Sequence, residues 1–272
     1  MKKLILSGLI GTFGVACVHA EETNRLAADY QAMTIAEAVA KAGDAVEPTA
    51  TTGMATNKPA WESAITLGAT LTRGNSDTLL ANTTFNTHRN HPTDEFIFGA
   101  DASYGENNSV KDAETLHGFG QYNHLFTPRW FGYMRADGLH DGIADIKYRV
   151  TLSPGAGYYF IKSKATTLAG EVGPGVVFEK LDGENQGYLT PRIAERFAHK
   201  MDDHTRIWQS LEFLPQVDNP DNFLANAEIG VEAALTKKLS LRTVMDDCYA
   251  NIPAPEREHN DLKLISGIAY KF

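Results

Sequence analysis

The residues best suited to chemistry in this chain are charged side chains that recur at every second position of long apolar segments. They carry both signs of charge and comprise Arg149, Glu171, Arg192, Arg196, Glu212, Glu228, Glu232 and Arg242. Arginine and carboxylate groups that meet away from water form hydrogen-bonded ion pairs. Left unpaired, the same groups line a path for polar solutes or ions. We predict that these residues face one shared interior, which their pairing closes or leaves narrow.

The other reactive residues give little indication of a catalytic or metal site. Eight of the nine histidines follow residue 20 and are scattered, and His88 and His91 have no third ligand nearby, as a zinc site requires. A membrane lipase needs a serine, a histidine and an orienting group. No histidine is followed two residues later by serine, which is the signature of outer-membrane phospholipases. The acidic segments 182–185 and 218–222 are typical of turns, with divalent-cation binding as the alternative. We predict no catalytic residue, metal or cofactor.

Long strands are needed to position the charged side chains, and the chain supplies them from Trp61 onward. Apolar residues alternate there with polar ones, as Ile65, Leu67, Ala69 and Leu71 do, and a period of two is typical of β-strands. Twelve segments follow this pattern: 61–73, 78–90, 95–106, 113–126, 130–140, 146–161, 166–179, 187–199, 205–216, 223–235, 239–249 and 261–272. Their lengths suit strands of about 9–11 residues that cross a bilayer at a tilt.

The charges also indicate which face of these strands meets lipid. A soluble sandwich or a lipocalin-like barrel alternates too, with its apolar face turned inward. So many charges on one face of long strands favour a polar lumen and an apolar exterior. We predict an all-β, antiparallel, up-and-down transmembrane barrel of about 12 strands. Two details depart from the pattern: Glu195 falls on the apolar parity, and segment 113–126 alternates poorly. A wrong register or a bulge would explain either departure.

The connections between the segments alternate in length. The tight ones are 90–94, 127–129, 162–165, 200–204 and 236–238. The longer ones are richer in Asp, Asn and Gly and comprise 107–112, 141–145, 180–186, 217–222 and 250–260. Short periplasmic turns and long external loops are typical of outer-membrane barrels. Among the external connections only the first, Gly74–Asp77, is short.

The first 59 residues differ in composition from the rest. Two lysines precede an apolar run over residues 4–18, and Val18-His19-Ala20 fits a cleavage site, so residues 1–20 are predicted to be a secretory signal peptide. Acylation of Cys17 in a lipoprotein is the alternative. Residues 21–59 combine an Ala-rich amphipathic segment with a Thr- and Pro-containing linker. They predict a periplasmic helical extension, either frayed or docked on a partner, and residues 60–272 are predicted to form the barrel.

Charge and cysteine content narrow the classes further. The net charge is -9 and there is no run of Lys and Arg, which argues against nucleic-acid binding. Cleavage after Ala20 leaves Cys248 as the single cysteine, so no internal disulfide can form. No other stretch is apolar for 18 residues, so helices are not expected to carry the chain through a membrane.

Aromatic residues and the last segment point to a membrane interface. The residues predicted to form interface girdles are Trp130, Tyr133, Tyr158, Phe160 and Tyr270. Gly267, Tyr270 and Phe272 are similar to the C-terminal strand that the barrel-insertion machinery reads. Ile265 departs from that pattern, because a polar residue is usual there.

Several stretches together carry a family likeness. Trp61 precedes the first segment, residues 71–78 read Leu-Thr-Arg-Gly-Asn-Ser-Asp-Thr, and residues 234–242 read Ala-Leu-Thr-Lys-Lys-Leu-Ser-Leu-Arg. Further matches are Asp247, Tyr249, Pro253 and Asn260-Asp261. Over roughly 61–272 the chain resembles the salt-induced outer membrane protein family, whose domain has no assigned function. The resemblance implies an outer-membrane barrel and no reaction. The family-motif turn of Arg73, Gly74, Asn75, Ser76 and Asp77 is interpreted as a hairpin turn, with a ligand role for Arg73 or Asp77 as the alternative.

Taken together, the sequence predicts an outer-membrane barrel that is structural or forms a narrow polar pore, linked to salt or osmotic stress by the resemblance. Its expected partners are outer-membrane lipid, the insertion machinery and a small polar solute or ion. An outer-membrane lipid-modifying enzyme is the first alternative. A soluble periplasmic β-protein is the second.

Overall fold

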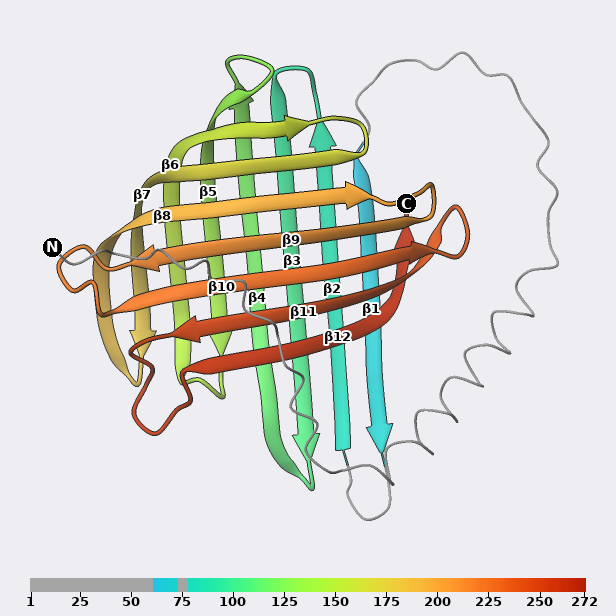
Figure 1. The fold of residues 1–272 in the computed structure, drawn as a ribbon. Helices are drawn as coiled ribbons and strands as arrows, with labels where there is room; N and C mark the ends of the chain where they lie inside the picture. Colours follow the sequence, from blue (N-terminus) through green and yellow to red (C-terminus); the bar gives the residue numbers. More distant parts are fainter. Residues whose placement is uncertain (1–60, 73–77) are drawn as a thin grey trace, which may run out of the picture. The chain divides into compact units, whose positions relative to one another are not determined.

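The structure, a computed structural model, describes residues 61–72 and 78–272. Within these ranges, antiparallel strands form one closed barrel in which each strand pairs with its neighbours in sequence and β1 pairs with β12 (Figure 1). The strands are β1 (Glu62–Thr72), β2 (Thr78–Asn90), β3 (Asp94–Asn107), β4 (Val110–Leu125), β5 (Trp130–Asp141), β6 (Ile146–Lys162), β7 (Thr166–Leu181), β8 (Glu184–Lys200), β9 (Thr205–Pro215), β10 (Phe223–Ala234), β11 (Leu239–Ala250) and β12 (Asn260–Lys271). The predicted all-β, antiparallel, twelve-stranded barrel is confirmed.

Several predictions lie outside the described residues. The signal peptide, Cys17, the helical extension of 21–59 and the turn Arg73–Asp77 are among them. Among the residues that the structure describes, no helix is long and apolar enough to cross a membrane.

Two of the connections predicted to be long are tight hairpins. Asn108 and Ser109 join β3 to β4, and Asp182 and Gly183 join β7 to β8; all four residues have positive φ. Positive φ at both central residues is the conformation of a type I′ turn, which suits the twist of paired strands. The predicted loops 107–112 and 180–186 were therefore wrong in extent, because the strands continue to the turn residues.

The poorly alternating segment in β4 is explained by glycine. Gly118 and Gly120 lie on the outer face, where the pattern requires apolar side chains. A Cβ on Gly120 would come within 3.0 Å of the ring of Phe98 on β3, so the glycine makes room for an aromatic neighbour. A bulge between Gly105 and Glu106 shifts the register of the same strand pair, as the disturbed alternation suggested.

The outer face of the barrel is apolar. Exposed large hydrophobic side chains share the outward parity of every strand; they include Ile65, Leu67, Phe85, Met134, Leu152, Val172, Ile193, Leu211, Ile229, Leu241 and Leu264. A surface of this kind is stable in contact with lipid rather than water, and the closed sheet leaves no unpaired strand edge. The barrel is a transmembrane one, with an inside-out arrangement of apolar and polar residues.

Aromatic side chains gather at the two ends of the strands. We call the end with turns such as 91–93 and 126–129 the turn end, and the opposite end the loop end. At the turn end, ring contacts link Trp61, Phe96, Phe98, Tyr122, Trp130, Tyr158, Phe160, Tyr270 and Phe272 in neighbouring groups. At the loop end they link Phe213, Phe223, Tyr249 and His259. Such belts mark the two membrane interfaces.

Candidate functional site: a charged layer across the lumen

Glu171 of β7 lies at the centre of a group of charged side chains inside the barrel. Its side chain is 0% exposed. It accepts hydrogen bonds from Arg192 Nη1 at 2.8 Å, from Gln121 Nε2 at 2.9 Å and from Arg196 Nη2. A buried carboxylate is stable only when several donors replace water, and Glu171 has three. We call this group, together with Glu212 and Arg135, the charged layer.

The layer continues from β8 to β9 and β5. Arg192 Nε donates to Glu212 Oε1 at 2.5 Å, and Asn226 Nδ2 donates to Glu212 Oε2 at 3.0 Å. Arg135 lies with its Nε 4.0 Å from Glu212 Oε1 and donates to Asp137 at 2.5 and 3.0 Å. Arg192 thus bridges two carboxylates, and each of these carboxylates has at least one further hydrogen-bond donor.

Some of these contacts join strands that are not neighbours in the sheet. Gln121 on β4 reaches Glu171 on β7, and Arg135 on β5 approaches Glu212 on β9. Side chains can meet across several intervening strands only through the lumen. Figure 1 shows how this happens, because β8–β12 pass in front of β1–β4 at a steep angle as a facing wall. The charged layer therefore spans the interior from one wall to the other.

An aromatic cluster lies in the lumen towards the turn end. Phe131, Tyr133, Tyr159 and Ala169 form a buried group, and the Arg192 guanidinium lies 5.2 Å from the centre of the Tyr133 ring. Tyr133 was predicted to lie in an interface girdle, and that prediction was wrong. It differs from Trp130 by an odd number of residues on one strand, so the two rings face opposite sides. The contact between Arg192 and Tyr133 joins the cluster to the charged layer.

Glu95 of β3 ties this aromatic cluster to β3 and β4. It accepts hydrogen bonds from Tyr159 Oη at 2.5 Å, Asn123 Nδ2 at 3.1 Å and Lys162 Nζ at 3.1 Å. The Lys162 ammonium also lies 4.0 Å from the centre of the Tyr159 ring. An acid, an amide, a phenol and an ammonium thus form one hydrogen-bonded group at the turn end of the lumen.

The remaining predicted residues face the same interior, but with partners that the sequence did not indicate. Arg149 pairs with Glu179 at 2.5 Å. Glu228 accepts from the Trp208 indole, and Glu232 contacts Arg206, Lys271 and Ser240. Arg242 has its guanidinium 4.7 Å from the Trp208 ring centre, and its Nε has no hydrogen-bond partner among the described residues.

Sequence reasoning missed Glu179, Glu95, Arg135 and Gln121. All four have inward parity in their strands, so alternation alone could have included them. Their partners across the lumen could not be found that way, because a period of two gives a face and not a distance between strands. The aromatic cluster carried no polar signal at all.

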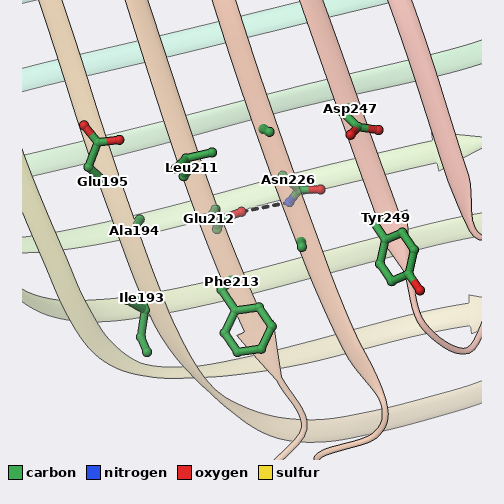
Figure 2. Close-up of a pocket in the computed structure, with 11 residues that line it drawn as sticks. Ile193, Ala194, Glu195, Leu211, Glu212, Phe213, Asn226, Asp247 and Tyr249 are labelled. Carbon is green, nitrogen blue, oxygen red and sulfur yellow. Dashed lines mark hydrogen bonds between the residues drawn. The ribbon is translucent and has the colours of Figure 1, made fainter. Parts of the chain in front are cut away.

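The outer face carries one unusual region, shown in Figure 2. A shallow hollow of about 440 Å³ lies over β8–β11, with Ile193, Leu211, Phe213 and Tyr249 around it. Glu195 and Asp247 also border it. Glu195 was the residue that broke the alternation, and it does face outward, where Gln209 Nε2 donates to it at 3.2 Å.

Most of the described histidines bond to other residues through their side chains. His117 lies 2.9 Å from Asp101, His124 lies 3.0 Å from Asp94, and His199 lies 2.8 Å from the Thr166 hydroxyl. His140 and His259 bond to main-chain carbonyls. None of these partners is a serine, and none of these contacts assembles the nucleophile and base of a lipase.

These observations define the class: a transmembrane β-barrel with an apolar exterior and a lumen that contains paired charges and aromatic rings. The family follows from comparison with protein-family models. The chain belongs to the family described as "Protein of unknown function, DUF481", whose model matches residues 65–272.

The barrel is also similar to solved structures. One is the NanC porin, with 7% identity over 78% of this chain and 100% of that chain and a TM-score of 0.49. Another is the translocator domain of the autotransporter NalP from Neisseria meningitidis, with 12% identity over 92% and 98% and a TM-score of 0.42. At these scores the likenesses carry no functional conclusion. No curated protein matches the chain.

Proposed function

We propose that this protein is an outer-membrane barrel whose lumen is held closed by the charged layer, so that it serves the envelope as a sealed or gated barrel and not as an open diffusion pore. The observation that carries the proposal is the pair of contacts from Gln121 to Glu171 and from Arg135 to Glu212, which cross the lumen. A twelve-stranded barrel lies between the small filled barrels and the wide channel-forming ones. Its side chains therefore decide whether it conducts.

The experiment is conductance of the purified, refolded chain in planar lipid bilayers. The wild type is expected to insert without large steps. The double variant Glu171→Ala, Arg192→Ala removes both members of a central pair, and Arg196 and Glu212 each lose one charged partner; it should open resolvable steps. The control is Lys111→Ala, Glu114→Ala, which removes an exposed pair outside the lumen at 2.9 Å. Large steady steps in the wild type, or identical traces for all three proteins, would contradict the proposal.

A narrow ion path is the second candidate. The side chains of His117 and Asp101 remain 31% and 35% exposed beside the charged layer, so part of the interior is in contact with water. Small wild-type steps that shrink in Asp101→Asn would favour this candidate over a sealed barrel. The solute would then be a small ion.

The orientation that we propose places the turn end in the periplasm, together with residues 21–59 after removal of a signal peptide. Short periplasmic turns are the rule in such barrels. Outer-membrane lipid is the expected partner of the apolar face. The insertion machinery is the expected partner of β12, where Tyr270 and Phe272 face outward and Gly267 allows Leu67 O of β1 to approach within 2.5 Å of its Cβ position.

A role in salt or osmotic stress is supported only by the resemblance of the motifs around the Arg73–Asp77 turn and segment 234–242. Growth of a deletion strain at high salt tests it, with loss of fitness as the expected result. The lipid-modifying alternative predicts phospholipid hydrolysis by the refolded barrel. Absence of hydrolysis is the result expected from the histidine contacts described above.

A further inference from the structure

The connection between β11 and β12 folds inward at the loop end of the barrel. We call its residues 251–259 the lid; in Figure 1 it is the dark red loop at the lower left. Ala254 in the lid is only 3% exposed. Lid residues Pro253, Ala254 and Arg257 line a cavity of about 80 Å³ together with lumen residues such as Asp141, Arg149, Cys248 and Lys263. We call this cavity the vestibule.

The two ends of the lid are firmly attached. Asn251 Nδ2 donates to Asp221 O at 2.6 Å, and Asn251 N donates to Phe223 O at 3.0 Å. At the other end, Ala250 N donates to His259 O at 2.8 Å. These bonds fix where the lid leaves and re-enters the sheet, so any movement is confined to the residues between them.

The middle of the lid is held by one ion pair with the far side of the barrel mouth. Arg257 Nε and Nη2 contact Asp145 Oδ2 at 2.7 and 2.5 Å. Asp145 lies in the connection between β5 and β6. We call this ion pair the latch. Its side chains are 41% and 40% exposed, so water and salt reach it and the pair is weak.

Backbone conformation at the latch is unfavourable for the residues present. Glu256 and Asp145 have φ of 63° and 55°, a region that non-glycine residues occupy sparsely. Conformations of this kind persist where the surrounding structure holds them. Two features stabilise these conformations here. One is a turn in the lid, in which Arg257 N donates to Ala254 O at 3.1 Å, and the other is the latch.

We propose that residues 251–259 form an external lid, held shut by the Arg257–Asp145 latch, which controls access of small polar molecules to the vestibule. The lid is distinct from the charged layer, which lies deeper in the lumen. Its external position rests on the orientation given in the proposed function. Breaking the latch frees the middle of the lid. The two ends of the lid stay attached, and the pairing of the strands is unchanged.

Cys248 supplies a native reporter, because it lines the vestibule together with Pro253 and Ala254. The residue is exposed to water, so the probe must be a reagent larger than water that has to pass the lid. The refolded full chain in detergent is treated with a small cationic methanethiosulfonate, and modification of the Cys248 peptide is followed by mass spectrometry. The wild type is expected to react much more slowly than the urea-unfolded chain. Arg257→Gln should react about fivefold faster than the wild type, the change that corresponds to loss of one exposed pair. Asp145→Asn should do the same, and it serves as the second variant if the first does not fold.

The matched control is Lys111→Gln. Lys111 pairs with Glu114 at 2.9 Å with exposures of 42% and 40%, nearly those of the latch, and both residues belong to β4 and not to the lid. It should label as slowly as the wild type. The exchanged variant Arg257→Asp, Asp145→Arg should label slowly again. High salt should speed labelling of the wild type and leave Arg257→Gln unchanged, because salt screens an exposed pair.

Equal labelling of Arg257→Gln and Lys111→Gln would overturn the lid, as would a wild type that labels as fast as the unfolded chain. The labelling reads the vestibule above the charged layer. The labelling result can therefore support the lid even if conductance contradicts the sealed lumen. Conductance can likewise support the sealed lumen even if labelling contradicts the lid.

Discussion

Replacing Glu171 by glutamine should destabilise the folded barrel strongly. The substitution keeps the size of the side chain but removes the negative charge that holds Arg192 and Arg196. The Glu171 side chain is fully buried and its Arg192 partner is 3% exposed, so water cannot enter to replace the lost interaction. Removing one partner of a buried pair costs about 3–5 kcal/mol. Arg192 keeps Glu212 at 2.5 Å, which places the expected loss near the lower end, at about 3 kcal/mol.

The measurement is a urea titration of the refolded barrel, followed by tryptophan fluorescence and by the gel shift between folded and unfolded chain. The matched control is Glu114→Gln, which removes the same charge from an exposed pair with Lys111. A surface pair contributes about 0–1 kcal/mol, so this control should unfold close to the wild type. A gap of at least about 2 kcal/mol between the two variants follows from these ranges.

The reasoning is refuted if both variants unfold at the same urea concentration. That result would mean that water or lumenal ions reach Glu171 and compensate for its charge. A second check is Glu171→Leu, Arg196→Leu, which removes a charged pair together. Exchanging a buried pair for apolar residues is often neutral or stabilising, so this double variant should be more stable than Glu171→Gln.

Two further predictions concern packing and pH. Gly230→Ala should destabilise the barrel by about 1–3 kcal/mol through overpacking, because its new methyl group would collide with the Trp208 ring. The control is Gly138→Ala, which has nothing within 4 Å of its Cβ position. Urea titration compares the two variants. Asp202 in the turn between β8 and β9 accepts hydrogen bonds from the main-chain N–H groups of His204 and Thr205, which lower the pKa of its carboxyl below the usual value of 3.8. The unfolded chain then binds more protons than the folded one below about pH 4, so this contribution to stability is present at neutral pH and is lost as pH falls towards the lowered pKa. The urea midpoint of Asp202→Asn should therefore fall less than that of the wild type over that acid range. Parallel curves of midpoint against pH for the two proteins would contradict the assignment.

The fold could be predicted from the sequence because a membrane barrel imposes its pattern on every strand. Apolar residues must face lipid and backbone groups must be paired, so a period of two over long segments leaves few alternatives. The predicted segments match the strands to within a few residues at each end. The hairpins at Asn108-Ser109 and Asp182-Gly183 were mistaken for loops because Asn, Asp and Gly are common in both.

The lumen was only partly predictable for a different physical reason. Alternation assigns Glu171 and Arg192 to the interior, and their opposite charges suggest pairing. Which arginine meets which glutamate depends on the stagger between strands and on how the two walls cross, and neither is encoded in local spacing. Arg149 therefore pairs with Glu179, which the sequence reading had not chosen.

The alternation assigns Glu195 to the correct face of its strand but does not explain how a carboxyl is stable there. Its parity placed it among apolar side chains, and the structure keeps it there, with a single hydrogen bond from Gln209. A carboxyl on the lipid face costs free energy that one amide bond offsets only in part. The inward carboxylates show the opposite balance, because Glu171 has three donors and Glu212 has two. The number of donors around each acid therefore separates the inward Glu171 and Glu212 from Glu195, which faces lipid at a cost.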